Sequence, residues 1–219
     1  MLLFLICLTF ALPANAGEIK CDVAVIGGGC GGCAAALQAA RLGASVTVLE
    51  ETEMLGGQMT SAAVSTMDDR GLTRTGIYKE FLDKIRAYYK TAGKNVSCCY
   101  WGGDTIAFEP LRGAKILHEM LADAGVNVIY GVRPVSAAAK KDTVVSAAFE
   151  TAEKEKITVR AKIFIDATEC GDFIPLTPAR WRAGNSLSPK IDKNGIIQDI
   201  TWVAVVKKYP DGVPAQLLL

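Results

Sequence analysis

Histidine and an excess of charge of either sign are nearly absent from this sequence. The 219 residues contain one histidine, and 24 Lys and Arg residues balance 23 Asp and Glu residues to a net charge of +1. There is no block of Lys or Arg, so we expect neither nucleic acid nor an anionic membrane surface as a partner. The single histidine, together with the lack of a second C-x-x-C pair, argues against a zinc site.

Cysteine is too sparse and too irregularly spaced for a disulfide scaffold. Cys30 and Cys33 form a C-x-x-C pair that could be a redox motif. We favour a packing role, because both fall in a turn and first helical turn that need small side chains. A bond between the adjacent residues Cys98 and Cys99 would close a strained ring, so we expect two thiols or separate partners there.

The N-terminal apolar run, residues 2–12, is too short to span a membrane. It is followed by Ala-Asn-Ala at residues 14–16, the small-x-small pattern of a signal-peptidase site. We therefore expect residues 1–16 to be a signal peptide and the exported, mature chain to begin at Gly17 without a stable membrane anchor. Residues 2–16 lack Lys and Arg, which signal peptides usually carry, so the alternatives are a buried N-terminal helix and a misassigned start codon.

The stretch from residue 21 to residue 50 predicts a nucleotide-binding βαβ unit. A lone G-x-G-x-x-G motif is weak, because glycine-rich turns arise by chance. Here the whole order is present: an apolar strand at residues 23–26, the glycine motif, an Ala-rich helix to about Leu42, an apolar strand at residues 46–49, and Glu50.

Each part of this unit has a physical task. Gly27 would make the tight turn, Gly29 would let the backbone approach a pyrophosphate, and Gly32 would pack the helix onto the strand. The phosphates would lie on the N–H groups at the positive end of the helix. Glu50, 23 positions after Gly27, would accept hydrogen bonds from the hydroxyls of an adenosine ribose.

The segment after Glu50 contains the glycine pair 56–57. In a nucleotide-binding unit this segment runs back across the cofactor, so we expect Gly57, Gln58 and Thr60 to lie near its pyrophosphate and ring. The alternative is an ordinary glycine-rich loop. Asp68 and Asp69 follow without hydrophobic periodicity, and we interpret them as part of a solvated loop, although both are candidates for a catalytic base.

Two amphipathic helices and a series of strands complete the pattern. We expect helices from residue 77 to about residue 93 and from residue 110, with Leu111, Ile116, Leu117 and Leu121 on the inner face of the second and His118 outside it. Four short β-prone runs follow, at residues 126–130, 134–138, 143–149 and 156–161. A separate apolar strand at residues 162–168 then ends in an acid and small residues, so the sequence predicts an antiparallel meander and a return to the parallel sheet.

These motifs, in the order VIGGGCGGCAAA, VTVLE, LGGQMTS, VRPV and FIDATECGD, resemble FAD-dependent oxidoreductases with the glutathione-reductase-like fold, above all a bacterial exported, xanthan-lyase-related group. The resemblance covers residues 21–172. It implies a Rossmann-like, three-layer α/β fold for binding FAD or NAD(P), with a β-meander crossover. It also implies FAD as cofactor, a small-molecule substrate and flavin-mediated two-electron chemistry.

The resemblance also implies roles for individual residues. FAD pyrophosphate would lie on Gly27, Gly29 and Gly32, the adenosine ribose on Glu50, the flavin on residues 57–60 and the adenine on the backbone of Val135, while Ala167 and Thr168 would pass the cofactor at a strand end. Glu169 departs from the motif, which usually has Gly there. No catalytic base can be assigned.

The resemblance divides the chain into a signal peptide at residues 1–16, an FAD-binding domain at residues 17–172 and the start of a substrate domain at residues 173–219. Members of this fold continue with a larger second domain and a return segment, so we expect this chain to be a fragment. An NAD(P)-dependent dehydrogenase and an inactive nucleotide-binding module are the alternatives. The meander and the Gly-Gly-Gln segment favour FAD over NAD(P).

Overall fold

The computed structural model describes residues 17–69, 71–94, 96, 105–184, 190, 194–195, 203 and 212. The expected signal peptide, Cys98 and Cys99 lie outside these residues. The chain divides into two compact units. Unit 1 consists of Met1–Glu53 and Glu119–Trp181, and unit 2 consists of Met54–His118 and Arg182–Leu219.

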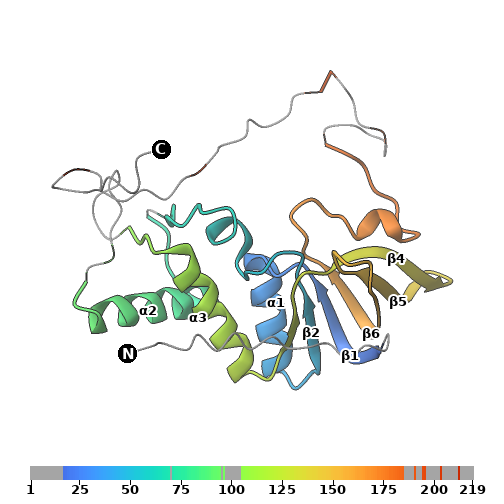
Figure 1. The fold of residues 1–219 in the computed structure, drawn as a ribbon, viewed down its shortest axis with the longest axis horizontal. Coiled ribbons are helices and arrows are strands. Elements are labelled where there is room, and N and C mark those ends of the chain that lie inside the picture. The colour runs from blue at the N-terminus through green and yellow to red at the C-terminus, as the bar shows by residue number, and fades with distance from the viewer. Residues whose placement is uncertain are drawn as a thin grey trace. The chain divides into compact units, whose positions relative to one another are not determined.

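Unit 1 is built on a six-stranded sheet with the strand order β3-β2-β1-β6-β5-β4 (Figure 1). The strands are β1 Glu18–Ile26, β2 Val46–Leu49, β3 Asn127–Ile129, β4 Arg133–Lys140, β5 Thr143–Glu150 and β6 Lys156–Asp166. Strands β3, β2, β1 and β6 are parallel, whereas β5 and β4 extend the sheet in antiparallel fashion. The predicted α/β class, with a parallel sheet and a meander, is confirmed.

Helix α1, Cys30–Arg41, joins β1 to β2. The small side chains of its alanines let α1 pack closely against the sheet, and Ala36 and Leu37 are buried. All four residues of β2 are buried, as expected for a parallel strand covered on both faces. The helix ends at Arg41, its C-cap residue Leu42 is exposed, and Gly43 then adopts a positive φ of 91°.

The expected separate strands at residues 156–161 and 162–168 are wrong, because both belong to β6. Arg160 and Lys162 interrupt the apolar pattern, which suggests the end of one strand and the start of another. Because alternate residues of a strand share one face, however, both charged side chains can lie on the same side of a single strand. Both charged groups form ion pairs with residues of β1: Arg160 with Glu18, and Lys162 with Asp22 at 2.7 Å. One long strand therefore pairs with both β1 and β5.

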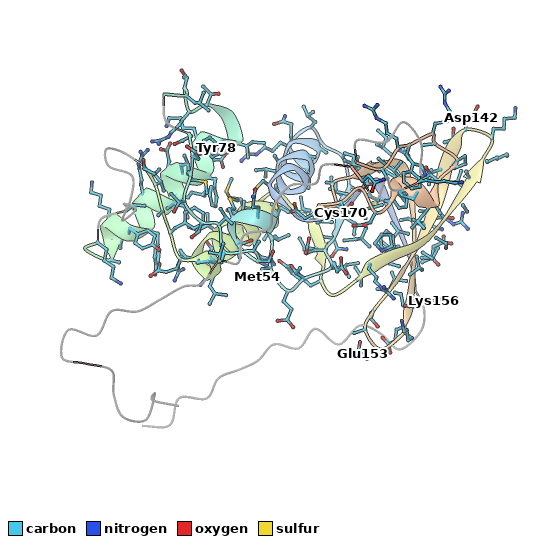
Figure 2. All side chains as sticks on the ribbon, turned by 90° about the horizontal axis from the view of Figure 1, so that it is seen from above. Met54, Tyr78, Asp142, Glu153, Lys156 and Cys170 are labelled. Carbon is cyan, nitrogen blue, oxygen red and sulfur yellow. The ribbon has the colours of Figure 1, made fainter. Side chains whose placement is uncertain are left out.

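The meander and the parallel strands share one apolar core in unit 1. Phe149 and Val159 are fully buried at its centre, and Phe173 from the segment after β6 packs into it. The rings of Phe173 and Phe164 stack with their centroids 5.8 Å apart. Figure 2 marks the two outer turns of the meander, at Asp142 between β4 and β5 and at Glu153 between β5 and β6.

Unit 2 contains α2, Gly76–Thr91, the short 3₁₀ helix Gly57–Met59, and most of α3, Pro110–Asp123. The spacing of Ile77, Phe81, Leu82, Ile85 and Tyr88 predicts the apolar face of α2, and Phe81, Leu82 and Ile85 are buried as predicted. Ile77 and Tyr88 are only half-buried, and Tyr89 is buried in place of Tyr88. The ring of Phe81 meets that of Phe108 edge to face, with centroids 5.5 Å apart.

The inner face expected for α3 is correct at Ile116, Leu117 and Leu121 but wrong at Leu111, whose side chain is 74% exposed. At 3.6 residues per turn, Leu111 lies about 120° around the helix from Leu117. Met120, 2% exposed, belongs to the buried face instead. His118 is exposed, as expected.

Within the described ranges, no helix combines the length and the apolar character needed to span a membrane. The same residues contain no cluster of His, Cys, Asp and Glu suited to holding a metal ion.

Two leucines of α3 provide a matched test of this packing. Leu117→Ala should lower the free energy of unfolding by about 2–5 kcal/mol, because it removes a side chain that is only 4% exposed. Leu111→Ala, the same change on the same helix, should stay within about 0.5 kcal/mol of the wild type. Denaturant unfolding would measure both, and equal losses would contradict the assigned face.

Candidate functional site

The carboxyl ends of β1, β2 and β6 meet at one turn. Gly27, directly after β1, donates its N–H to the carbonyl of Leu49 at the end of β2, at 2.8 Å. Ala167, directly after β6, donates its N–H to the carbonyl of Ile26 at 2.7 Å. In open α/β sheets, ligands bind in the crevice outside the carboxyl ends of the strands, so this edge is the candidate site.

Two glycines of the turn are required by the crowding of the backbone. Gly27 has a φ of 96°, and a Cβ there would lie 2.4 Å from the carbonyl oxygen of Ala167. A Cβ on Gly32 would lie 2.0 Å from the carbonyl oxygen of Gly27. These distances agree with the predicted roles of Gly27 in the turn and of Gly32 in packing α1 onto it.

Gly29 has a different environment, because the group nearest to its missing side chain is a flexible carboxylate and not backbone. A Cβ built there meets one flexible group, Oε1 of Glu169, at 2.9 Å, and otherwise only the Ala167 oxygen at 4.0 Å. Gly29 is the N-cap residue of α1, and no side chain in the described part of the chain caps that position. The first N–H groups of a helix lack intrahelical acceptors and attract anions. The start of α1 therefore suits a pyrophosphate.

Glu50 is held rigidly next to this turn. Its side chain is buried, and its carboxylate accepts hydrogen bonds from the Gly28 N–H at 2.6 Å and from the N–H and hydroxyl of Thr52 at 2.8 and 2.6 Å. Because a carboxylate offers about four acceptor positions, one remains for a further donor. The predicted contact with a ribose hydroxyl is compatible with this geometry.

Tyr130 and Cys33 are neighbours of the Glu50 carboxylate. Burial raises the pKa of Tyr130 to about 12, and the neighbouring Cys33 and Glu50 add to that rise. Cys33 is 2% exposed and donates its thiol hydrogen to the carbonyl of Gly28 at 3.1 Å. Such burial agrees with the packing role that we favour for this cysteine, whereas Cys30 is exposed.

Val135 lies at a β-bulge in β4. Its neighbours pair with β5, Pro134 with Phe149 and Ser136 with Ala148, but the register skips Val135. Three residues earlier, the Val132 N–H donates to the carbonyl of Glu50 at 3.1 Å. The bulge takes the backbone of Val135 out of the β4–β5 register close in sequence to the Glu50 contact, and its contact with adenine stays a prediction.

Asp166 organises the loop that carries Ala167 and Thr168. Its carboxylate accepts hydrogen bonds from the N–H and hydroxyl of Thr168, at 3.1 and 2.7 Å, and from the N–H groups of Phe173 and Ile174, at 3.1 and 2.8 Å. The sequence predicts this aspartate at the strand end that passes the cofactor, but not its hydrogen bonds to the loop that follows. Its position directly after an apolar run was the available signal.

Gly57, Gln58 and Thr60 lie together in unit 2. The Thr60 side chain is 1% exposed, and its hydroxyl donates to the carbonyl of Leu55 at 2.6 Å, so it stabilises the turn. Gln58 is exposed. Of the two side chains, Gln58 is therefore the one whose polar group can reach a ligand.

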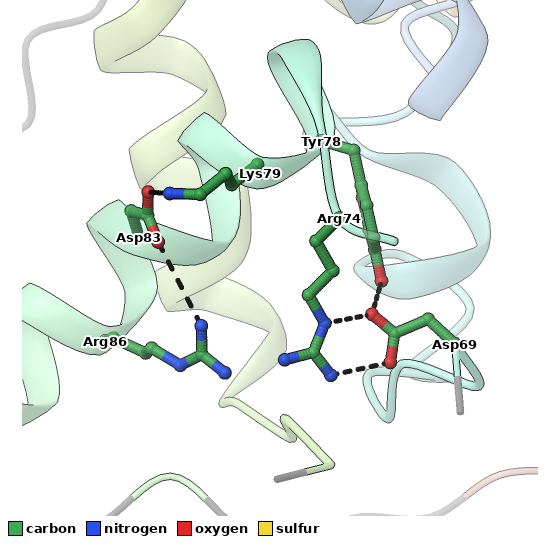
Figure 3. Close-up of polar contacts among 6 residues, drawn as sticks. All are labelled: Asp69, Arg74, Tyr78, Lys79, Asp83 and Arg86. Atoms are coloured by element: carbon green, nitrogen blue, oxygen red, sulfur yellow. Dashed lines mark hydrogen bonds and ion pairs between the residues drawn. The ribbon is translucent and has the colours of Figure 1, made fainter. Parts of the chain in front are cut away.

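The expected solvated loop is confirmed for Asp68, which is exposed, but is wrong for Asp69, which is 6% exposed. Figure 3 shows the reason: Arg74 donates to both carboxylate oxygens of Asp69, at 2.5 and 2.8 Å, and the Tyr78 hydroxyl donates at 2.8 Å. The bonds from Arg74 lower the pKa of Asp69, Tyr78 adds to this, and burial opposes it. Asp69 is therefore a structural anion and a poor catalytic base.

Comparison with known proteins gives one family match. The model of a family described as FAD dependent oxidoreductase matches residues 22–214. No curated protein sequence matches the chain.

Solved structures with the same fold include a geranylgeranyl bacteriochlorophyll reductase-like protein from Thermoplasma acidophilum, at 20% identity and a TM-score of 0.52. They also include THI4 from Thermovibrio ammonificans, at 20% identity and a TM-score of 0.53. The matches cover 73% and 72% of this chain but only 42% and 61% of those proteins. At this identity they show the fold alone.

Substitutions of Gly29 and Gly31, at the start of α1, can distinguish an effect on ligand binding from an effect on folding. Gly29→Val should leave the chain folded and abolish dinucleotide binding, because the added side chain fills the space for the phosphates. Gly31→Ala is the control, since a Cβ there has nothing within 4 Å. Calorimetric titration and circular dichroism would measure binding and folding, and dinucleotide binding to folded Gly29→Val protein would contradict the site.

The aspartates in Figure 3 test the buried ion pair. Asp69→Asn should cost up to about 3–5 kcal/mol of unfolding free energy at neutral pH, because it removes the buried anion to which the Arg74 guanidinium donates two hydrogen bonds. Asp83→Asn, which removes an exposed anion paired with Lys79, should cost under about 1 kcal/mol.

The Asp69 effect should depend on pH in one direction. A carboxyl group whose pKa is lower in the folded state stabilises above its ordinary pKa of about 4, and this contribution is lost as the pH falls through the folded pKa. The difference between the wild type and Asp69→Asn should therefore shrink on acidification. A difference that stays constant from neutral to strongly acidic pH would contradict the assignment.

Proposed function

This chain belongs to a family of enzymes, the FAD-dependent oxidoreductases, whose cofactor is FAD, and we propose that it transfers two electrons between the flavin and a small organic substrate. The observation that carries this proposal is the start of α1 at Gly29, which lacks a side-chain cap among the described residues and lies next to the fixed carboxylate of Glu50. A diphosphate joined to an adenosine ribose needs that combination of groups.

The residues of unit 1 provide for the adenosine and pyrophosphate parts of FAD. The α1 N–H groups would hold the pyrophosphate at Gly29, where the nearest side chain among the described residues is the flexible Glu169. The remaining acceptor position of Glu50 would bind a ribose hydroxyl. The backbone of Val135, displaced at its bulge from the β5 register, would bind the adenine.

The flavin of bound FAD supplies the electron transfer, and the protein supplies position and electric field. In unit 2 we assign Gly57, Gln58 and Thr60 to the flavin half. Gln58 contributes its exposed side chain, whereas Thr60 supports the turn from within. Ala167 and Thr168 line the strand end next to Gly27, where bulkier residues would crowd the turn.

FAD is favoured over NAD(P) as the dinucleotide. The first βαβ unit is common to both classes, so it does not separate them. The β4–β5–β6 meander and the family match both support FAD.

A binding titration tests this proposal. The purified chain should quench flavin fluorescence when it is added to FAD, and it should bind NAD⁺ much more weakly. Glu50→Ala should weaken FAD binding by about 1.5–3 kcal/mol, or about ten- to a hundredfold in Kd, because a charge-assisted acceptor is lost. Glu51→Ala, at the exposed neighbouring position, is the control. Preference for NAD⁺, or equal affinity in both variants, would refute the assignment.

We also propose that the protein is exported, on the strength of the signal-peptidase pattern at residues 14–16. Edman sequencing of the protein recovered from the outside of expressing cells should then begin at Gly17. Recovery of protein that still begins at Met1 would remove this part of the proposal.

A further inference from the structure

The side chain of Glu169 occupies the place in which the pyrophosphate should bind. Its Oε1 atom would lie 2.9 Å from a Cβ on Gly29, and Gly29 is the N-cap residue of α1. A carboxylate there lies beside the positive end of the helix, where anions are stabilised. A diphosphate and this carboxylate cannot both occupy that volume.

The loop around Glu169 is tied at both ends. On one side the Ala167 N–H donates a hydrogen bond to the carbonyl of Ile26. On the other, the N–H groups of Phe173 and Ile174 donate to the carboxylate of Asp166. The hydroxyl of Thr168 also accepts a hydrogen bond from the Asp172 N–H at 2.7 Å. This network fixes the backbone that presents Glu169 to α1, in the region marked by Cys170 in Figure 2.

The Glu169 side chain itself is not tied. It is exposed, and within the described part of the chain it makes no hydrogen bond or ion pair. Rotation about its side-chain bonds would move the carboxylate into solvent without disturbing the loop. The backbone of Glu169 is therefore fixed, but its carboxylate can move away from the start of α1.

We propose that Glu169 is a displaceable internal anion: its carboxylate occupies the pyrophosphate position at the start of α1 in the FAD-free chain and turns into solvent when FAD binds. The proposal rests on the proposed function. Its consequence is that Glu169 stabilises the FAD-free chain and lowers the affinity for FAD, because the entering phosphates must displace an anion from the same helix end.

The test compares Glu169→Gln with Glu153→Gln. The first change keeps the shape of the side chain and removes the charge at α1. The second makes the same change at an exposed position in the β5–β6 turn. The two glutamates flank the 11 residues of β6, a separation of about 35 Å, which is several Debye lengths at about 0.1 M salt.

Titration of each FAD-free variant with FAD should show about fivefold tighter binding for Glu169→Gln, the size expected for one charge at a helix N-terminus. The gain should shrink as the salt concentration rises. Glu153→Gln should bind like the wild type. Unchanged affinity in Glu169→Gln would overturn the proposal, and weaker binding would do so too, because it would show that Glu169 helps to hold FAD.

A second readout needs no flavin. Without FAD, Glu169→Gln should melt at a lower temperature than Glu153→Gln, because the start of α1 loses its internal anion. Equal melting temperatures would overturn the proposal. If the wild-type chain binds no FAD, the proposed function fails, but this comparison still decides whether Glu169 acts as an anion at α1.

Discussion

The structure of unit 1 depends on the close approach of three backbone segments at Gly27. The end of β1, the start of α1 and the residue after β6 come so close that a Cβ on Gly27 or Gly32 would overlap a backbone oxygen. Backbone cannot retreat as a flexible side chain can, so this crowding fixes where α1 begins. The position of the helix N-terminus, and with it the place for an anion, follows from steric exclusion.

The sequence predicts this part of the molecule well because the signals are local. The strand, the glycine spacing and the helix are each set by neighbours in the chain, and Gly27 and Gly32 have the crowded surroundings that a tight turn and close helix packing require. The contact of Gly29 with a pyrophosphate stays a prediction. Glu50 is also found where its spacing placed it. Its bonds to Gly28 and Thr52, however, come from the folded turn and could not be read from spacing.

The errors occur where the position of a side chain depends on contacts that the sequence pattern does not reveal. Asp69 resembles a loop residue in sequence, and only the approach of Arg74 and Tyr78 makes its burial stable. Leu111 has the apolar side chain of a core residue but lies on the exposed face of its helix. In β6, charged residues suggested an interruption, whereas ion pairs with Glu18 and Asp22 let the strand continue.

Strand β6, which pairs with both β1 and β5, also constrains the order in which unit 1 can fold during translation. It pairs with β1 along nearly its whole length, from Glu18 with Thr158 to Ile26 with Asp166, so partners about 140 residues apart must meet. Contacts of such long range make folding slow, since a long loop must close before they form. On the ribosome, β1 has no partner on its β6 side until residue 166 has emerged. Until then Gly27 lacks the Ala167 backbone against which it packs, so the nucleotide site is among the last features of unit 1 to form.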